Sequence, residues 1–245
     1  MRNEEVSDGI VVIPVRNEEE NLLLVLQNLL NLQLFSPNQI WVIDNGSTDR
    51  SSQIAKSFAA TVHFEPKLGY GAAILKALGE IKASGLYPTF LLIIDGDGSD
   101  DTNSVQDLLS VFTKADCDLV IGSRILGKAE KGSLSFLQRF GNHLTCFLIY
   151  VFYRRKFTDL GPMRIIRYSS LLQMGLKDRT WGWNVEMQIR ALQYNMKVIE
   201  IPVTYFKRRF GVSKISGTIL MALRVGIKIL YTFFYLTLWD RPKRP

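Results

Sequence analysis

Short apolar runs alternate with segments of helical periodicity through the first half of the chain. The apolar runs predict buried strands over 9–15, 40–44, 61–64, 90–95 and 119–122. Between them, apolar residues recur at helical spacing and predict four helices. The first begins near residue 21, the second ends near residue 58, and the others cover 69–83 and 104–114. This alternation favours an α/β fold in which helices cover both faces of a mainly parallel sheet.

The pattern changes after Arg124. Residues 125–135 are rich in Gly, Lys and Ser and are predicted to form a mobile loop. An aromatic-rich helix is expected over 137–153. It is followed by a strand or turn at 159–167, helices near 169–175 and 185–194, and a strand at 197–203. We expect one domain over 1–217, with halves 1–124 and 125–217, and then a helix and basic tail over 218–245.

The last apolar stretch, residues 219–239, is interrupted by Arg224 and Lys228. Its uncharged runs are shorter than the roughly 20 residues that a membrane-spanning helix needs. Arg224, Lys228, Tyr231 and Tyr235 share one helical stripe, and apolar residues fill most of the remaining surface. The pattern predicts a helix that lies on the inner face of a membrane with its basic stripe towards the headgroups. A helix packed on the sheet or on a second subunit is the alternative.

Composition excludes several classes of protein. Of the 245 residues, 47% are hydrophobic and 22% charged, which suits a packed core and excludes a disordered chain. Two Cys and two His exclude a disulfide framework and make a zinc site improbable, so reduced cytoplasmic surroundings are expected. The first eight residues are polar, and no signal peptide is predicted.

Charge divides the chain into two unlike halves. Residues 1–120 carry 8 Lys and Arg against 17 Asp and Glu, whereas residues 121–245 carry 22 against 6. The acidic half suits cations, and the basic half suits phosphates or an anionic membrane. No nucleic-acid partner is expected, because the chain has no zinc-finger, helix-turn-helix or RNP motif.

Carboxylates stand where the predicted strands end. Asp44 ends the second strand, and Asp95 and Asp97 follow the fourth strand with one glycine between them. Open α/β sheets bind ligands at the carboxyl ends of parallel strands. Two carboxylates at this spacing can bind one hard cation, Mg²⁺ or Mn²⁺, which commonly bridges protein carboxylates to substrate phosphates. An acidic surface turn is the alternative interpretation.

Eight segments occur in an order that is typical of one family: VVIPVRNEE, VIDNGSTD, GYGAAILKAL, LIIDGDGSDD, LVIGSR, DLGPMRIIR, GWNVEMQ and RRFGVSK. Over residues 9–216 the chain resembles family 2 glycosyltransferases, which have the GT-A fold. It is most similar to the branch that contains dolichol-phosphate mannose synthase and bacterial polyprenyl-phosphate glucosyltransferases. The resemblance implies an α/β nucleotide-sugar transferase.

The resemblance implies that one group of residues surrounds the nucleotide: Pro14, Arg16, Asn17, Glu18, Lys67, Gly69 and Gly71. The resemblance also implies that Asp44 accepts a hydrogen bond from the nucleotide base. It implies that Asp95 contacts the ribose or the metal and that Asp97 is a metal ligand. The chain departs from the family at two positions. Asn45 stands where a second Asp is frequent, and Ser99 stands where mannose synthases commonly have Gln.

Other implied roles lie in the second half. Asp159 matches an Asp near the acceptor and the transferred sugar, and Glu186 lies where other members place a general base. With Asp97, these two residues are the candidate catalytic set. Trp183 is expected to bind substrate by stacking on a sugar, as is Trp181, with core packing as the alternative for both. The candidate phosphate contacts are Arg124, Arg139, Arg208 and Lys214.

The sequence therefore predicts an inverting glycosyltransferase that uses Mg²⁺ or Mn²⁺ and a nucleotide-diphosphate sugar, with UDP-sugars preferred. Its expected acceptor is a polyprenyl or dolichyl phosphate at an anionic membrane surface. One alternative is transfer to a hydroxyl acceptor with Glu186 or Asp159 as base, because a hydroxyl must lose its proton during attack. A non-catalytic nucleotide-sugar or lipid-phosphate binding protein is a further alternative. The sugar and the oligomeric state, including a homo-oligomer, are left open.

Overall fold

The computed structural model describes residues 8–211 and 219–242, and its first half alternates strands and helices. The elements are β1 (Gly9–Val15), α1 (Glu19–Asn31), η2 (Pro37–Gln39), β2 (Ile40–Asp44), α2 (Ser51–Ser57), β3 (Thr61–Phe64), α3 (Tyr70–Ala83), β4 (Phe90–Ile93) and α4 (Ser104–Ala115). Three of the predicted strands, β1, β2 and β3, have the predicted bounds. The α/β class is confirmed.

The second half adds three strands and four helices to the described part of the chain. They are β5 (Leu119–Ala129), α5 (Phe136–Tyr153), β6 (Arg164–Arg167), α6 (Tyr168–Met174), α7 (Trp183–Gln193), β7 (Val198–Tyr205) and α8 (Ile219–Leu238). The prediction of a loop over 125–135 is wrong for its first part. After a register shift between Ser123 and Lys128, β5 continues to Ala129 and pairs with the end of β7.

All seven strands lie in one sheet, in the order β3-β2-β1-β4-β6-β5-β7. The sheet is parallel except at β6, which runs antiparallel to both β4 and β5. The reversed strand β6 therefore joins the nucleotide half implied by the sequence to the second half. The carboxyl ends of β1, β2 and β4 meet at one edge, where their side chains can share a ligand.

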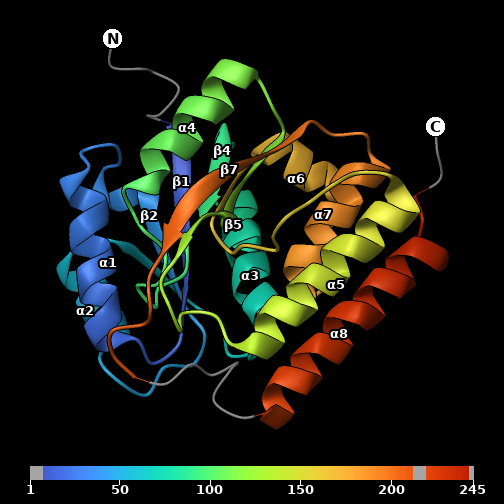
Figure 1. Cartoon of the computed structure of the whole chain (residues 1–245). Helices are drawn as coiled ribbons and strands as arrows, with labels where there is room; N and C mark the ends of the chain where they lie inside the picture. The colour runs from blue at the N-terminus through green and yellow to red at the C-terminus, as the bar shows by residue number, and fades with distance from the viewer. Residues whose placement is uncertain (1–7, 212–218, 243–245) are drawn as a thin grey trace.

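Helices α1, α2 and α4 cover one face of the sheet, and α3, α6 and α7 cover the other (Figure 1). A hydrophobic core lies on each face: Val11 and Ile13 of β1 belong to the first core, and Ile10 and Val12 belong to the second. Because both faces are covered, β1 reads as a continuous apolar run. The second core also includes residues of α5 and α8, such as Ile149 and Phe233.

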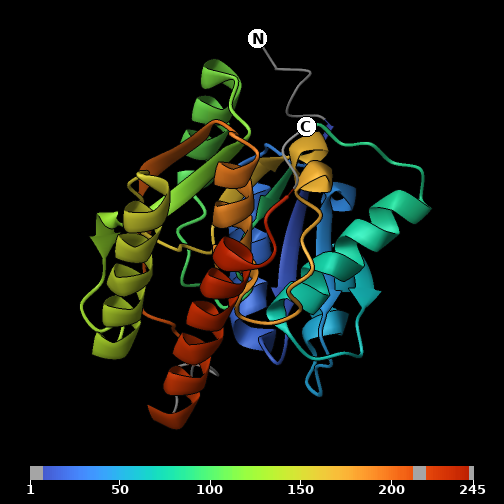
Figure 2. The ribbon, with the colours of Figure 1, turned by 90° about the vertical axis from the view of Figure 1, so that its right-hand side faces the viewer.

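Helices α5 and α8 lie side by side at the outer edge of this second core (Figures 1 and 2). Phe152 of α5 meets Phe233 and Phe234 of α8, with ring centroids 5.5 and 6.4 Å apart. The predicted basic stripe is not intact, because Lys228 Nζ lies 2.6 Å from Asp178 Oδ2 and is directed towards the protein. Within the described residues, Leu220–Leu238 is a helix long and apolar enough to cross a membrane by length and composition alone.

The start of α3 packs against the backbone of the segment that precedes α7. Gly71 N–H donates to Thr180 O and Ala72 N–H donates to Arg179 O, at 3.3 and 2.8 Å. A Cβ on Gly71 would lie 2.0 Å from Asp178 O, which is closer than atoms can approach. Glycine is required here because two backbones touch, since its φ is not in the left-handed region.

We expect Gly71→Ala to lower the free energy of unfolding by about 1–3 kcal/mol, the usual cost of overpacking. Gly79→Ala on the same helix is the matched control, because its Cβ would meet nothing within 4 Å. Alanine exceeds glycine in helix propensity by about 1 kcal/mol, so the control is expected to be neutral or stabilising. Urea unfolding of both variants measures the difference. Equal effects at the two positions would contradict the proposed backbone contact.

Candidate active site

A cavity of about 430 Å³ opens where β1, β2 and β4 end. We call it the strand-end pocket. Several sequence-predicted residues line it: Pro14, Arg16, Glu18, Asp95, Asp97 and Arg208. Its wall is completed by residues for which the sequence assigned no substrate-binding role, among them Asn45, Leu68 and Tyr70. The structure therefore brings most of the predicted nucleotide residues together with Arg208, which lies near the end of the second half.

Carboxylates concentrate at the floor of this pocket. Asp95 follows β4, and burial together with the neighbouring Asp100 and Asp97 carboxylates raises its pKa well above the ordinary value. Burial and the charge of Asp97 raise the pKa of Asp100 to about 7. The Asp95 N–H donates to Asp100 Oδ2 at 3.2 Å, which fixes the turn. Crowded carboxylates of this kind create a strongly negative site for a cation.

Arg208 supplies positive charge to the same site. Its guanidinium hydrogen-bonds to Glu18 Oε1, and its Nη2 lies 3.5 Å from Asp97 Oδ2. The segment that carries Arg208 is fixed to α1, because Asn21 exchanges hydrogen bonds with the backbone of Phe210 in both directions. Glu18 and Asp97, which belong to the acidic half, are thus paired with a cation of the basic half.

A second cavity, of about 220 Å³, lies between α5 and α8, and we call it the helix pocket. Apolar and small residues of the two helices form its walls, among them Leu137, Gly141, Ala222, Val225, Gly226 and Ile229. Arg124, Asp95 and Asp97 line it as well. Tyr70, Asp95, Asp97 and Trp181 line both cavities, so the two pockets adjoin at these four side chains.

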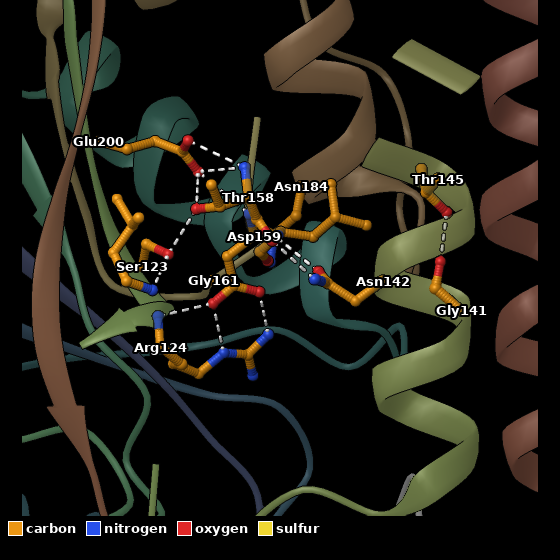
Figure 3. Close-up of polar contacts among 12 residues, drawn as sticks. Ser123, Arg124, Gly141, Asn142, Thr145, Thr158, Asp159, Gly161, Asn184 and Glu200 are labelled. Atoms are coloured by element: carbon orange, nitrogen blue, oxygen red, sulfur yellow. Dashed lines mark hydrogen bonds and ion pairs between the residues drawn. The ribbon is translucent and has the colours of Figure 1, made fainter. Parts of the chain in front are cut away.

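Arg124 is held rigidly at the wall of the helix pocket by a buried carboxylate (Figure 3). Its Nε and Nη2 donate to the two oxygens of Asp159, each at 2.8 Å, and its backbone N–H donates to Asp159 Oδ2. Burial opposes the charged form, but the hydrogen bonds and charge of Asp159 outweigh it and raise the pKa of Arg124. The guanidinium also lies over the Tyr205 ring, 5.1 Å from its centroid.

The segment around Asp159 is itself held by two further side chains, one from β7 and one from α5 (Figure 3). Glu200 of β7 accepts the N–H groups of Thr158 and Asp159 at 2.9–3.1 Å. Asn142 of α5 donates to Thr158 O and accepts from Leu160 N–H. The predicted catalytic residue Asp159 therefore positions Arg124, and its fully buried carboxylate does not line either pocket.

Two predicted residues lie away from the pockets. The Glu186 carboxylate is buried at the start of α7 and accepts the N–H groups of Lys177 and Asp178. Burial raises the pKa of Glu186 despite these hydrogen bonds. Trp183 is fully buried within the second core, so the structure replaces the stacking prediction for it with core packing. Trp181, two residues earlier, lines both pockets instead.

Four predicted nucleotide residues support the pocket rather than line it. The Asp44 carboxylate accepts Ser47 N–H and Ser52 Oγ–H, and Asn17 accepts from Thr48 N–H at 2.7 Å. Lys67 and Gly71 contribute backbone contacts. Arg139 is exposed on α5, and Lys214 lies outside the described residues.

The sequence prediction left the role of Asn45 open. Its Nδ2 donates to the carbonyls of Glu65 and Lys67, and its Oδ1 accepts Gly69 N–H, at 2.8–3.0 Å. Only an amide can donate and accept in this way, so Asn45 holds the loop beside the strand-end pocket. Its replacement of the more frequent Asp was the signal for this role.

Comparisons with known proteins agree with this architecture. The sequence model of the family described as "Glycosyl transferase family 2" matches residues 10–181. An uncharacterized glycosyltransferase of Mycobacterium tuberculosis is 32% identical over 210 residues, which cover 85% of this chain and 90% of that protein. Glycosyltransferase AglJ of Haloferax volcanii is 27% identical over 217 residues, covering 88% of this chain and 67% of that protein.

The fold also matches solved structures. Glucosyl-3-phosphoglycerate synthase from Mycobacterium tuberculosis, in complex with Mn²⁺, UDP and glucosyl-3-phosphoglycerate, superposes with a TM-score of 0.72. The two sequences are 16% identical, and the match covers 97% of this chain and 81% of the other. At this identity the likeness shows a shared GT-A fold. The family match and the curated relative together show that this chain belongs to glycosyl transferase family 2.

Proposed function

We propose that this glycosyltransferase moves a sugar from a nucleotide-diphosphate sugar, with UDP-sugars preferred, to a polyprenyl phosphate. The observation that carries this proposal is the helix pocket. Apolar residues of α5 and α8 form one part of its wall, and polar residues form the other, among them Gln138 and Asn142 of α5. A rigid arginine, Arg124, lines it next to Asp95 and Asp97. Such a cavity matches a molecule with a hydrocarbon chain and a phosphate head.

The phosphate end of this acceptor fits Arg124. Nε and Nη2 are used by Asp159, and among the described residues Nη1 makes no hydrogen bond. A guanidinium that is already fixed in place binds phosphate with little loss of side-chain freedom. A phosphate oxygen is an anion and needs no base. This agrees with a site in which the carboxylates of Asp159 and Glu186 are both occupied by N–H donors.

We further propose that Asp95 and Asp97 hold Mg²⁺ or Mn²⁺ with the donor diphosphate. The crowded carboxylates that raise the pKa of Asp95 fit such an ion, because their oxygens are the ligands that these cations prefer. Within the described residues no three His, Cys, Asp or Glu side chains form a metal cluster, so diphosphate and water would supply the further ligands. The bound ion would neutralise charge on the departing diphosphate. Glucosyl-3-phosphoglycerate synthase binds Mn²⁺ or Mg²⁺ together with UDP.

The reaction on these residues is a single displacement with inversion. An oxygen of the acceptor phosphate attacks the anomeric carbon, and the bond from that carbon to the β-phosphate oxygen breaks. The nucleoside diphosphate leaves with the electron pair. Arg124 orients the attacking phosphate, and Arg16 and Arg208 lie at the strand-end pocket where the diphosphate would bind. Proximity and charge stabilisation then account for most of the rate.

A hydroxyl acceptor is the second candidate. Its support is the fold neighbour glucosyl-3-phosphoglycerate synthase, whose complexes contain phosphoglyceric acid, a phosphate-bearing acceptor. Arg124 suits the phosphate of such a molecule equally well. Transfer to its hydroxyl requires a base. The two residues that the sequence offered for this role, Glu186 and Asp159, both lie outside the pockets with their carboxylates bonded to N–H groups.

We also propose that the chain lies on the cytoplasmic face of an anionic membrane. Exposed apolar side chains repeat at helical spacing along α5 and α8: Phe136, Phe140, Phe147, Val151, Leu220, Leu223, Ile227, Tyr231, Phe234 and Leu238. Soluble surfaces rarely carry such long apolar stripes on adjacent helices. The helix pocket lies between the same two helices, so a lipid acceptor would reach it from the bilayer.

Removal of one metal-binding carboxylate tests the cation. Asp97→Ala is expected to reduce turnover by at least about 10²-fold, the usual cost of losing one electrostatic stabiliser. Asp107→Asn, an exposed change on α4, is the matched control and is expected to retain activity. Sugar transfer is measured with Mn²⁺ and with excess EDTA. Full activity of the wild-type chain in EDTA would contradict the metal proposal.

A second variant tests whether Glu186 acts as a general base, the role that the resemblance implied for it. Glu186→Gln is expected to change the turnover with polyprenyl phosphate by less than about tenfold, because a phosphate nucleophile loses no proton. Turnover and donor binding are measured together, and thermal unfolding verifies the fold of the variant. A loss of about 10²–10⁴-fold with normal donor binding would identify Glu186 as a base and support a hydroxyl acceptor.

Vesicle flotation tests the membrane surface. The full chain is expected to float with anionic vesicles. Phe147→Asp is expected to reduce the bound fraction about tenfold, because it replaces an apolar contact of about 1.5–3 kcal/mol with a charge. Leu23→Asp is the matched control, because Leu23 is an exposed apolar residue of α1, which covers the opposite face of the sheet. Equal losses in both variants, or carbonate-resistant insertion of the wild-type chain, would refute peripheral binding.

A further inference from the structure

The boundary between the two pockets is where the transferred sugar has to lie. The donor nucleotide is assigned to the strand-end pocket and the acceptor to the helix pocket. The bond that breaks and the bond that forms share the anomeric carbon, so the sugar bridges the two sites. Four side chains line both cavities, and two of them, Asp95 and Asp97, are assigned to the cation. The other two are Tyr70 and Trp181.

Tyr70 presents a hydroxyl group at the boundary between the two pockets. Its oxygen is buried and lies beside the Asp95 carboxylate, one of the two carboxylates assigned to the cation. A phenol hydroxyl donates one hydrogen bond and can also accept one, so it can contact Asp95 and a sugar hydroxyl together.

Trp181 offers a different kind of surface. It is half-buried, whereas its neighbour Trp183 is fully buried in the core. A pyranose ring has a face of C–H groups and a rim of hydroxyls. An indole ring can pack against the C–H face, and a phenol hydroxyl can form a hydrogen bond with the hydroxyl rim. Together the two side chains offer both kinds of contact.

The backbone fixes these two residues relative to each other. The first turn of α3, which begins with Tyr70, is bonded to the segment that ends at Trp181 through Gly71 N–H and Ala72 N–H. That segment is held on its other side by Asp178, which pairs with Lys228 at 2.6 Å and accepts from Thr232 at 3.3 Å. The two aromatic side chains are therefore mounted on one rigid unit, which suits a binding site.

We propose that Tyr70 and Trp181 form the subsite for the transferred sugar. The Trp181 indole packs against its C–H face, and the Tyr70 hydroxyl bonds to one of its hydroxyl groups. This inference rests on the proposed nucleotide-sugar donor and is independent of the acceptor. It makes both residues contacts of the sugar and not of the nucleotide.

The test compares the affinity for a nucleotide with the affinity for the corresponding nucleotide sugar. Calorimetry on the full chain in Mn²⁺ measures UDP against UDP-glucose and GDP against GDP-mannose, and the pair that the wild-type chain binds is used. Trp181→Ala is expected to weaken the nucleotide sugar about tenfold and to leave the nucleotide within about twofold. Trp181→Phe keeps an aromatic face and is expected to restore most of the loss.

Tyr70→Phe removes one hydroxyl and is expected to weaken the nucleotide sugar selectively and to lower kcat. Tyr87→Phe, at a tyrosine that is 66% exposed, is the matched control and is expected to behave as wild type. Equal loss for nucleotide and nucleotide sugar would show a merely structural role. Unchanged affinities and rates would also overturn the proposal.

The proposed acceptor and the proposed sugar subsite can be refuted independently of each other. If the wild-type chain transfers to an alcohol and not to polyprenyl phosphate, the proposed acceptor is refuted, whereas a selective loss in Trp181→Ala still supports the subsite. If the wild-type chain binds neither nucleotide sugar, both the donor assignment and the subsite are overturned.

Discussion

The pairing of Arg124 with the fully buried Asp159 carboxylate is the interaction on which the second half of the structure depends. A carboxylate removed from water requires charge and hydrogen-bond partners, and Asp159 receives three bonds from Arg124 alone. The surrounding bonds from Glu200, Asn142 and Gln188 tie β7, α5 and α7 to the same short segment. That segment leads into β6, the strand that reverses direction inside the sheet. One buried charge thus fixes the segment that leads into β6, the contact of that segment with α5, and the position of the Arg124 guanidinium at the helix pocket.

Local pattern was sufficient for most elements of both halves, including α5, α6, α7 and β7 to within about two residues. It failed at the end of β5 and at the direction of β6. The bounds of β1, β2 and β3 follow from apolar runs covered on both faces or ended by turn residues. The extension of β5 to Ala129 was missed because residues 124–129 are all half-buried or exposed and contain Gly127, Lys128 and no long apolar run. The reversal of β6 has no local signal, because strand direction is set by what the neighbouring strands allow.

The candidate site shows the same division. Asp95, Asp97, Glu18 and Arg208, which were selected by their position in motifs, line the strand-end pocket together. Spacing alone did not reveal which of two neighbouring side chains faces a cavity. The Asp44 carboxylate bonds to Ser47 and Ser52, whereas Asn45 lines the strand-end pocket. Trp183 packs in the core, whereas Trp181 lines the pocket. The choice in each pair depends on backbone direction, which only the folded chain defines.

The strands at the two ends of the sheet also determine how copies of this chain can meet. β3 has four residues, and β7 carries the exposed Pro202, which has no N–H to donate. Short edges and edge prolines prevent a strand of another molecule from adding to a sheet. Growth of the sheet by addition of strands from other copies is therefore blocked at both ends. The exposed apolar side chains of α5 and α8 are then the surface that remains for contact between copies in water.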